Sequence, residues 1–272
     1  MRQVRLSRLG IGGDIMLIEK TLFGIDDKVK TAIEILKDLQ PDEGYYVADS
    51  GGKDSCVILE LVKMADVKFD AHHSLTTIDP PELVYFLRDH HPETEVHRPK
   101  KPFLTALVKN GFPQRQIRWC CKEYKEIGGS GRLVLTGVRA AESHKRAKRN
   151  FLETCTFDPS KRYLHIIFTW SELDVWEFIK KYNVPYCKLY DEGNKRIGCL
   201  FCPMAGSQRL KDVKKYPGYV KAFKKAFNKL YEKGKEREAF KRWKSGEEMF
   251  DWWISENIKT EDESQGRLFY EE

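Results

Sequence analysis

Short apolar runs alternate with longer amphipathic segments through most of the chain, and this alternation limits the folds that it can adopt. Each run is short enough for a β-strand, and the segments between the runs carry apolar residues at helical spacing. The predicted strands are 45–48, 69–76, 95–98, 132–138 and 164–168, and the predicted helices are 26–39, 55–64, 81–89, 103–109 and 171–182. This order is typical of a parallel sheet with helices on both faces. We therefore expect an α/β fold with a doubly wound parallel sheet.

Beyond Pro203 the strand signals end and only helical spacing continues. Phe223 and Phe227 belong to the apolar stripe of one predicted helix, whose other side carries lysines. Those lysines are Lys221, Lys224, Lys225 and Lys229. Residues 207–244 hold 14 Lys or Arg against 4 Asp or Glu, whereas the net charge of the whole chain is only +7. We expect an α/β domain at 1–205 and a basic helical region at 206–272.

Length and composition exclude several classes of protein. With 272 residues and 41% hydrophobic content, the chain can bury a sizeable core and is not a disordered tail. No apolar run reaches the roughly 18 residues of a membrane span, and the amino terminus lacks a signal-peptide pattern, so we expect mature protein without membrane contact. Seven cysteines are too few for a secreted disulfide scaffold of this length and favour a reducing cytoplasm.

The sequence VADSGGKDSC at 47–56 places two glycines and a lysine between a predicted strand and a predicted helix. A glycine-rich turn before a helix presents backbone N–H groups at the positive end of the helix dipole, where anions bind. Gly51 and Gly52 let a phosphate approach the backbone, and Lys53 adds a positive charge. The pattern therefore predicts a phosphate site.

The polar neighbours of the glycines refine this prediction. Ser50 and Ser55 add hydroxyl donors. Asp54 would repel a phosphate, so we expect it to hold a magnesium ion or to cap the helix. The plainer interpretation is an ordinary glycine turn with a solvated lysine.

The string SGGKDS resembles the pyrophosphate-binding loop, or PP-loop, of ATP pyrophosphatases that adenylate their substrates. That group shares its adenine nucleotide alpha-hydrolase-like fold with the sulfonucleotide (APS and PAPS) reductases. The resemblance implies that residues 50–55 bind ATP with Mg²⁺ and that Lys53 and Asp54 act in catalysis.

The segment GVRAAESHKR is similar to a second family segment, in which arginines after a strand meet the nucleotide phosphates. This implies that Arg139, Ser143 and Arg146 contact the nucleotide and that Arg139 takes part in catalysis. Guanidinium groups suit phosphate oxygens because they stay charged and donate two parallel hydrogen bonds. The alternative for each arginine is an ordinary surface charge.

Two cysteine motifs resemble the halves of the cluster-binding signature of APS reductases. They are RWCCKEYKE, with Cys120 and Cys121, and RIGCLFCP, with Cys199 and Cys202. The resemblance implies that the four thiolates hold one [4Fe-4S] cluster and that Lys125 links cluster and substrate electrostatically. Four thiolates also suit a structural Zn²⁺ site, and a site without metal is the third interpretation. Adjacent cysteines favour the cluster, because neighbouring side chains diverge.

The other three cysteines have less specific contexts. Cys56 lies among apolar residues of a predicted helix, so we expect it in the core. Cys155 and Cys187 fit no motif, and Cys155 is a candidate sulfur carrier.

The resemblance extends from about Gly44 to Gly206, with two departures from the reductases. Those enzymes carry a catalytic cysteine in a flexible tail, whereas no cysteine follows Cys202 here. Their loop also lacks the full SGGxDS string. Both departures favour the branch that consumes ATP and carries a cluster, such as the sulfurtransferase of DNA phosphorothioation and the cluster-dependent tRNA thiolation enzymes.

We therefore expect an enzyme that adenylates an acceptor, releases pyrophosphate and transfers sulfur from a donor such as a cysteine desulfurase. The acceptor is a nucleic acid, a small molecule or a protein. The basic segment suits a nucleic acid, although lysine runs are also common on ordinary solvated faces. The alternatives are a sulfonucleotide reductase, a noncatalytic nucleic-acid-binding subunit and a structural zinc protein, and the oligomeric state stays open.

Overall fold

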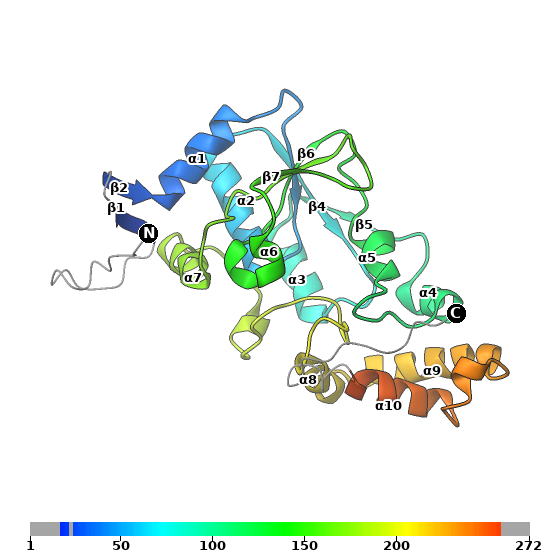
Figure 1. Ribbon diagram of the computed structural model, residues 1–272. Coiled ribbons are helices and arrows are strands. Elements are labelled where there is room, and N and C mark those ends of the chain that lie inside the picture. Colours follow the sequence, from blue (N-terminus) through cyan, green and yellow to red (C-terminus); the bar gives the residue numbers. More distant parts are fainter. Residues whose placement is uncertain (1–16, 22–23, 257–272) are drawn as a thin grey trace. The chain divides into compact units, whose positions relative to one another are not determined.

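The computed structural model describes residues 17–21 and 24–256, and Figure 1 traces the elements of these ranges. The predicted mature amino terminus and the cysteine-free tail lie outside the described residues. In the described ranges no helix is long and apolar enough to cross a membrane. The chain forms two compact units, which are described separately.

The first unit, which comprises residues up to His73, Glu82–His97 and Gly128–Gly193, contains a six-stranded sheet. Its strand order is β5 (Thr94–His97), β4 (Phe69–Ser74), β3 (Tyr45–Ala48), β6 (Leu133–Leu135), β8 (Arg162–Leu164) and β7 (Leu152–Thr154). The pairs β3–β4, β3–β6 and β6–β8 are parallel, and β7 runs antiparallel to β8. In register, Val47 pairs with Ala71 on one side and with Leu135 on the other. The expected α/β class with a mostly parallel sheet is confirmed.

The helices of this unit are α1 (Lys28–Asp38), α2 (Lys53–Ala65), α3 (Pro81–His90), α6 (His144–Ala147) and α7 (Glu172–Lys181), with 3₁₀ turns η2 (Ala140–Glu142) and η3 (Lys188–Tyr190). A separate hairpin of β1 (Ile18–Thr21) and β2 (Gly24–Asp27) precedes α1. Helix α2 packs against both α1 and α7. Its residues Val57, Ile58 and Leu61 are fully buried. This buried face fixes the orientation of the helix that follows the glycine turn.

Local hydrogen bonds set the starts of α1 and α7. Asp27 accepts hydrogen bonds from the N–H groups of Val29 and Lys30, so α1 begins at residue 28 and not at 26 as predicted. Ser171 and Asp174 form a capping box at the start of α7, which places Glu172 in the first helical turn.

The second unit comprises Ser74–Pro81, Arg98–Ile127 and the chain from Asn194 onward. Its elements are α4 (Phe103–Asn110), α5 (Trp119–Tyr124), α8 (Gln208–Lys215), α9 (Pro217–Gly234), η4 (Glu238–Phe240) and α10 (Gly246–Glu256). Helix α9 packs against α4 and α10 around an aromatic core. Phe223 and Phe227 are fully buried in that core, as the apolar stripe predicts.

The compact units differ from the expected boundary between residues 205 and 206. Segment 98–127 groups with the helical region because Phe103 and Leu107 pack in the core that holds Phe223 and Phe227. The four motif cysteines therefore lie in the second unit, whereas the sequence placed them with the glycine turn.

Several strand and helix boundaries also differ from the predictions. The strand expected at 164–168 is 162–164, because the chain turns after Leu164 with a hydrogen bond from the N–H of Phe168 to the carbonyl of His165. The strand expected at 132–138 ends at Leu135. Strand β7 and helix α5 were not predicted, since each is short, whereas α8 lies within the helical region expected from residue 206.

Candidate functional site

The glycine turn between β3 and α2 has the backbone that the sequence predicts. Gly51 adopts a left-handed φ of 68°, and a Cβ at this position would lie 2.6 Å from Cδ1 of Leu83. Gly52 is the N-cap of α2 and offers no side chain to the first N–H groups of the helix. The turn thus lies at the positive end of the α2 dipole, where anions bind, and the N–H groups of Gly51, Gly52 and Lys53 each have an acceptor within the site.

The side chain of Asp49 stabilises this turn through hydrogen bonds. Its buried carboxylate accepts hydrogen bonds from the N–H of Gly51 at 2.9 Å, Nδ1 of His91 at 2.6 Å and the hydroxyl of Thr94 at 2.9 Å. Burial alone would raise the pKa of Asp49, but the hydrogen bond and charge of His91 and the other donors outweigh it and lower that pKa. The prediction from sequence missed Asp49, although an acid directly after a buried strand is a visible signal.

The two serines of the turn lie against each other. Their hydroxyl oxygens are 3.2 Å apart, and Ser55 donates to the carbonyl of Gly52 at 2.9 Å. The N–H of Gly52 donates to the Ser50 hydroxyl at 3.3 Å. The Ser50 hydroxyl can therefore donate to an oxyanion at the turn, and the Ser55 hydroxyl can do so once it rotates away from the Gly52 carbonyl.

Two cations and two carboxylates form a network at the start of α2. Arg139, which is 2% exposed, donates from Nε to Asp54 at 2.7 Å and from Nη2 to Glu172 at 2.6 Å. Nζ of Lys53 lies 3.5 Å from Asp54 and 3.3 Å from Glu172. Burial opposes ionisation of Glu172, but Lys53 and Arg139 outweigh it and lower the pKa of that carboxyl. The two positive charges of Lys53 and Arg139 thus balance the two negative charges of the carboxylates in the site.

The guanidinium of Arg139 is directed to Asp54 and Glu172. Its expected contact with a nucleotide phosphate stays a prediction. The backbone of Gly137 also packs closely against Asp54, since a Cβ at Gly137 would lie 2.7 Å from the Asp54 Cβ. The arrangement presents two carboxylates, the donor set that Mg²⁺ takes together with substrate phosphates.

Tyr190 is a second residue that the prediction missed. Its hydroxyl accepts a hydrogen bond from the N–H of Lys53 at 3.0 Å, and its ring centroid lies 5.4 Å from the Lys53 Nζ. Burial raises the pKa of the Tyr190 hydroxyl, which therefore stays protonated. Tyr190 and Glu172 come from segments far from the turn in sequence, so no local pattern could assign them to it.

The remaining predicted nucleotide contacts lie after β6. Ser143 is exposed and caps α6, where its hydroxyl accepts from the N–H of Arg146 at 3.3 Å. Arg146 forms an ion pair with Glu142 one turn earlier. Their contact with a nucleotide stays a prediction.

The four motif cysteines gather in the second unit. Cys120 and Cys121 lie on α5, whereas Cys199 and Cys202 lie on a turn, in which the N–H of Cys202 donates to the carbonyl of Cys199 at 3.4 Å. Cys199 also donates to the hydroxyl of Thr76 at 3.4 Å. All four are free thiols.

The thiols of this site differ in pKa: that of Cys121 is lowered, whereas the hydrogen bond with Cys121 raises the pKa of Cys120 and burial raises that of Cys199. A hydrogen bond from Cys120, followed by the charges of Lys125 and Arg118, lowers the pKa of Cys121 to about 6 despite burial. Lys125 donates to Cys199, and the Cys199 and Cys202 sulfurs raise the pKa of Lys125. The predicted partnership of Lys125 with the cysteine site therefore has a structural basis.

Two observations test which cofactor fits these thiols. A single tetrahedral Zn²⁺ with bonds of about 2.3 Å would hold its sulfurs ~3.8 Å apart, yet in the described residues no three of the four thiols lie within 4.8 Å of one another. In the same described ranges, buried Nη2 of Arg209 and Nε1 of Trp119 have no hydrogen-bond acceptor. The identity of the metal centre at these thiols stays a prediction.

The other cysteines differ in exposure. Cys56 and Cys187 are buried, and burial raises the pKa of both thiols. Cys155 is partly exposed and accepts a hydrogen bond from the Tyr163 hydroxyl at 3.6 Å, which contributes to lowering its pKa against the effect of burial. Cys56 is thus a core residue as predicted.

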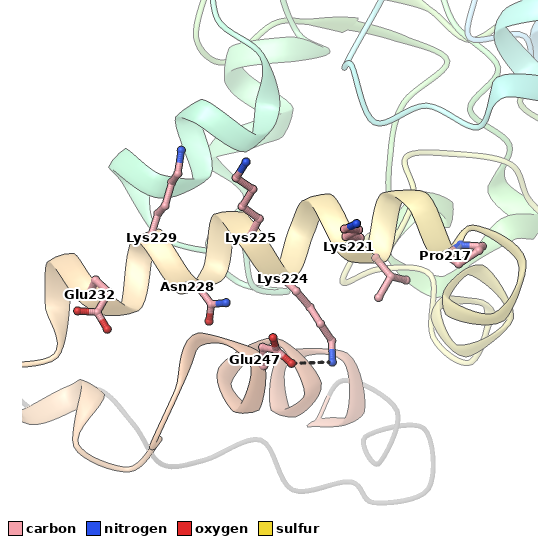
Figure 2. Close-up of a pocket in the computed structure, with 9 residues that line it drawn as sticks. Pro217, Lys221, Lys224, Lys225, Asn228, Lys229, Glu232 and Glu247 are labelled. Carbon is pink, nitrogen blue, oxygen red and sulfur yellow. Dashed lines mark ion pairs between the residues drawn. The ribbon is translucent and has the colours of Figure 1, made fainter.

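A basic groove of about 800 Å³ lies along α9 in the second unit (Figure 2). Lys221, Lys225 and Lys229 are exposed on this helix, on the side away from Phe223 and Phe227. Lys224 turns instead to α10, where it pairs with Glu247 at 3.6 Å and Asp251 at 3.3 Å. Three of the four predicted lysines therefore remain directed to solvent.

The chain is similar to adenosine 5'-phosphosulfate reductases and to uncharacterized relatives. Residues 44–205 match the family model of the phosphoadenosine phosphosulfate reductase domain. An adenosine 5'-phosphosulfate reductase of Staphylococcus haemolyticus is 30% identical over 202 residues, which cover 65% of this chain and 78% of that protein. An uncharacterized protein of Methanocaldococcus jannaschii is 28% identical over 230 residues, which cover 77% of this chain and 45% of that protein. The chain spans about half the length of the first uncharacterized relatives that it matches.

Among solved structures, phosphoadenylyl-sulfate reductase from Candida auris in a phosphate complex aligns with a TM-score of 0.49 and 19% identity. The alignment covers 62% of this chain and 88% of that chain. FMN adenylyltransferase from Candida glabrata in complex with ATP aligns with a TM-score of 0.45 and 15% identity, over 63% of this chain and 60% of that chain.

Proposed function

We propose a function from the premise that the chain belongs to the phosphoadenosine phosphosulfate reductase domain family. Named relatives in this family are enzymes that act on sulfonucleotides. The proposed activity is adenylation of an acceptor with ATP, release of pyrophosphate, and transfer of sulfur to the activated acceptor. The observation that carries the proposal is the turn at residues 50–55, whose N–H groups, hydroxyls and lysine suit a pyrophosphate group.

Each residue of the turn has a separate role in binding ATP or in stabilising the leaving pyrophosphate. The N–H groups at the start of α2 and the hydroxyls of Ser50 and Ser55 bind the β and γ phosphates. Lys53 offsets the charge that grows on the departing pyrophosphate. Asp54 and Glu172 would hold Mg²⁺, which supplies further positive charge against the phosphates. Arg139 keeps both carboxylates in position.

The reaction balances in two steps. An acceptor oxygen forms a bond to the α phosphorus of ATP as the bond to the β-phosphate oxygen breaks, and pyrophosphate leaves. Hydrosulfide then forms a carbon–sulfur bond as the carbon–oxygen bond to AMP breaks. A persulfide donor such as a cysteine desulfurase gives the same product if a thiol reduces the sulfur–sulfur bond.

The cysteine site supports the sulfur half of the proposal. Cys120, Cys121, Cys199 and Cys202 would hold a [4Fe-4S] cluster, which supplies a centre for sulfur or electron transfer. The positive charge of Lys125 and the unsatisfied donor of Arg209 near Cys202 suit the negative charge of such a cluster.

The acceptor that the surface favours is a nucleic acid. Lys221, Lys225 and Lys229 line a groove on a rigid helix, where they can neutralise successive phosphates. Small molecules and proteins are the other acceptor classes.

Pyrophosphate release from ATP, measured with and without nucleic acid and cell extract, tests the activity directly. Lys53→Ala should abolish release and weaken ATP binding in calorimetry by roughly 1.5 to 3 kcal/mol, the loss typical of a charge-assisted contact. Lys63→Ala is the matched control, since Lys63 lies in the last turn of the same helix and pairs with Glu93. Equal ATP affinity in the parent and the Lys53 variant contradicts the assignment.

The second candidate is sulfonucleotide reduction, which the 30% identity to an adenosine 5'-phosphosulfate reductase favours. Thermal unfolding with each nucleotide separates the two. ATP should raise the unfolding temperature more than adenosine 5'-phosphosulfate does, because a bound ligand stabilises the folded state by mass action. The reverse order favours the reductase.

A further inference from the structure

A second group of potential metal ligands lies in the first unit, on strands β4 and β5. Ligand atoms of His72, Glu95 and His97 all lie within 4.8 Å of one another. Nδ1 of His72 is 2.8 Å from Nε2 of His97 and 3.6 Å from Oε2 of Glu95. None of these residues belongs to the glycine turn or to the four-cysteine motif.

The surroundings of His72 fix which nitrogen faces this group. Asp70 accepts a hydrogen bond from Nε2 of His72 and is itself held by an ion pair with Arg132. A carboxylate on Nε2 leaves the lone pair of Nδ1 directed toward His97 and Glu95. This carboxylate–histidine arrangement is the usual outer shell of a histidine that binds a metal.

Packing restricts the imidazole ring further. The Tyr46 ring stacks on His72 with centroids 4.1 Å apart and planes 10° apart, and the His97 ring stacks at 4.9 Å and 18°. His72 is therefore pre-positioned before any ion binds.

We propose that His72, His97 and Glu95 bind a divalent transition-metal ion such as Zn²⁺. Two imidazoles and one carboxylate are a common ligand set for such ions. Two nitrogens on a tetrahedral Zn²⁺, each about 2.0 to 2.1 Å from the ion, lie ~3.3 Å apart. The two rings need to separate by only a few tenths of an ångström, which the partly exposed His97 on an edge strand permits.

The position of the ligands indicates what the ion does for the fold. His72 lies on β4, whereas Glu95 and His97 lie on β5, the four-residue strand at the edge of the sheet. An ion bound by residues of both strands links the edge strand β5 to β4. Glu95 and His97 are partly exposed, so a fourth ligand position remains accessible to water or a substrate group.

Metal counting on the full chain tests the proposal. Protein loaded with Zn²⁺ and dialysed should retain one equivalent more in the parent than in His97→Gln or Glu95→Gln. The matched control is His90→Gln, an exposed histidine on α3 that is not among the ligands, and it should retain the parent's content. Asp70→Asn should weaken Zn²⁺ binding by about 10- to 100-fold, the range for an outer-shell partner.

The visible absorption of bound Co²⁺ distinguishes the proposed site from the cysteine thiols. Ions at the cysteines give sulfur-to-metal charge-transfer absorption, which the histidine variants should leave unchanged. Ions at the new site should add visible d–d bands that disappear in His97→Gln. Equal metal content and equal d–d bands in the parent and His97→Gln would overturn the proposal and leave the His72–His97 contact as an ordinary hydrogen bond. Equal losses in His90→Gln would overturn it as well.

Discussion

At the scale of single residues, the chemistry of the turn depends on side chains that sequence patterns cannot connect. The residues of SGGKDS and the four motif cysteines are recognisable because each motif is contiguous or short. Glu172 and Tyr190 are not, since their partners in the site come from distant segments. Asp49 had a local signal, an acid directly after a strand, that the prediction missed. Arg139 was recognised as a site residue, but its carboxylate partners were not, and these partners set what its guanidinium can do.

The buried carboxylate of Asp49 predicts a pH dependence of folding. Its pKa is lower in the folded chain than the value of about 3.9 in an unfolded chain. Its stabilising contribution is therefore fully present above that unfolded value and is lost as pH falls through the lower folded value. Asp49→Asn should reduce the free energy of unfolding at pH 7 by ~1 to 3 kcal/mol, and the difference from the parent should shrink in acid.

Urea unfolding of both proteins from neutral to acidic pH measures this difference. Asp38→Asn, which changes an exposed carboxylate on α1, should follow the parent at every pH. A constant gap between the parent and Asp49→Asn across the range would show that the Asp49 charge does not stabilise the turn.

The cysteine site gives a second prediction at this scale. Cys199→Ser should remove bound iron and the broad visible absorption of anaerobically purified protein, because a hydroxyl replaces one cluster ligand. Cys56→Ser should keep both, since Cys56 is packed in the core of the first unit. Iron analysis and absorption spectra check the pair, and equal iron in Cys199→Ser and the parent argues against a cluster at these thiols.

At the scale of elements, sequence periodicity located the long helices and the parallel strands that build the site. Strand β3 and the helices α2, α3, α4 and α7 lie within about two residues of their predicted bounds. The failures are short elements, such as β7 and α5, because three to six residues carry too little periodicity. The cysteine pair of α5 was therefore recognised as a motif before its helix was.

The backbone geometry between β3 and α2 predicts that substitutions of its two glycines reduce stability by different amounts. Gly51→Ala should destabilise the chain by about 1 to 3 kcal/mol, since an alanine at φ 68° is strained and its Cβ would meet Leu83. Gly52→Ala should cost less, because Gly52 has an ordinary φ of −78° and its nearest neighbour would be the Ser50 hydroxyl at 3.3 Å. Thermal unfolding of the two variants checks the order, and equal losses would contradict it.

At the scale of the whole molecule, the two candidate sites lie in different compact units. The glycine turn, Arg139 and Tyr190 belong to the first unit, and the four cysteines and α9 belong to the second. A linear reading of the sequence missed this division because the second unit gathers three separate segments around one aromatic core. The prediction that Phe223 and Phe227 form that core is confirmed, and it leaves the lysines of α9 as a surface feature.

Those lysines support the last prediction, on nucleic-acid binding. Replacing Lys221, Lys225 and Lys229 together by Gln should leave stability nearly unchanged, since exposed charges contribute little to folding. Affinity for nucleic acid should fall, and the salt dependence of log K should flatten by up to about 0.9 per lost phosphate contact on duplex or about 0.7 on single strands. Lys224 stays in place because it pairs with α10.

Binding titrations at several salt concentrations measure both quantities. The matched control replaces Lys30 and Lys37, two exposed lysines of α1 in the first unit, together with the exposed Lys109 of α4. This control removes the same charge from other surfaces, so it separates a local contact from the effect of net charge. If the two triple variants lose affinity and salt slope equally, the groove on α9 is not the contact surface. Pyrophosphate release would be unaffected by that outcome, since it depends on residues 50–55 and not on α9.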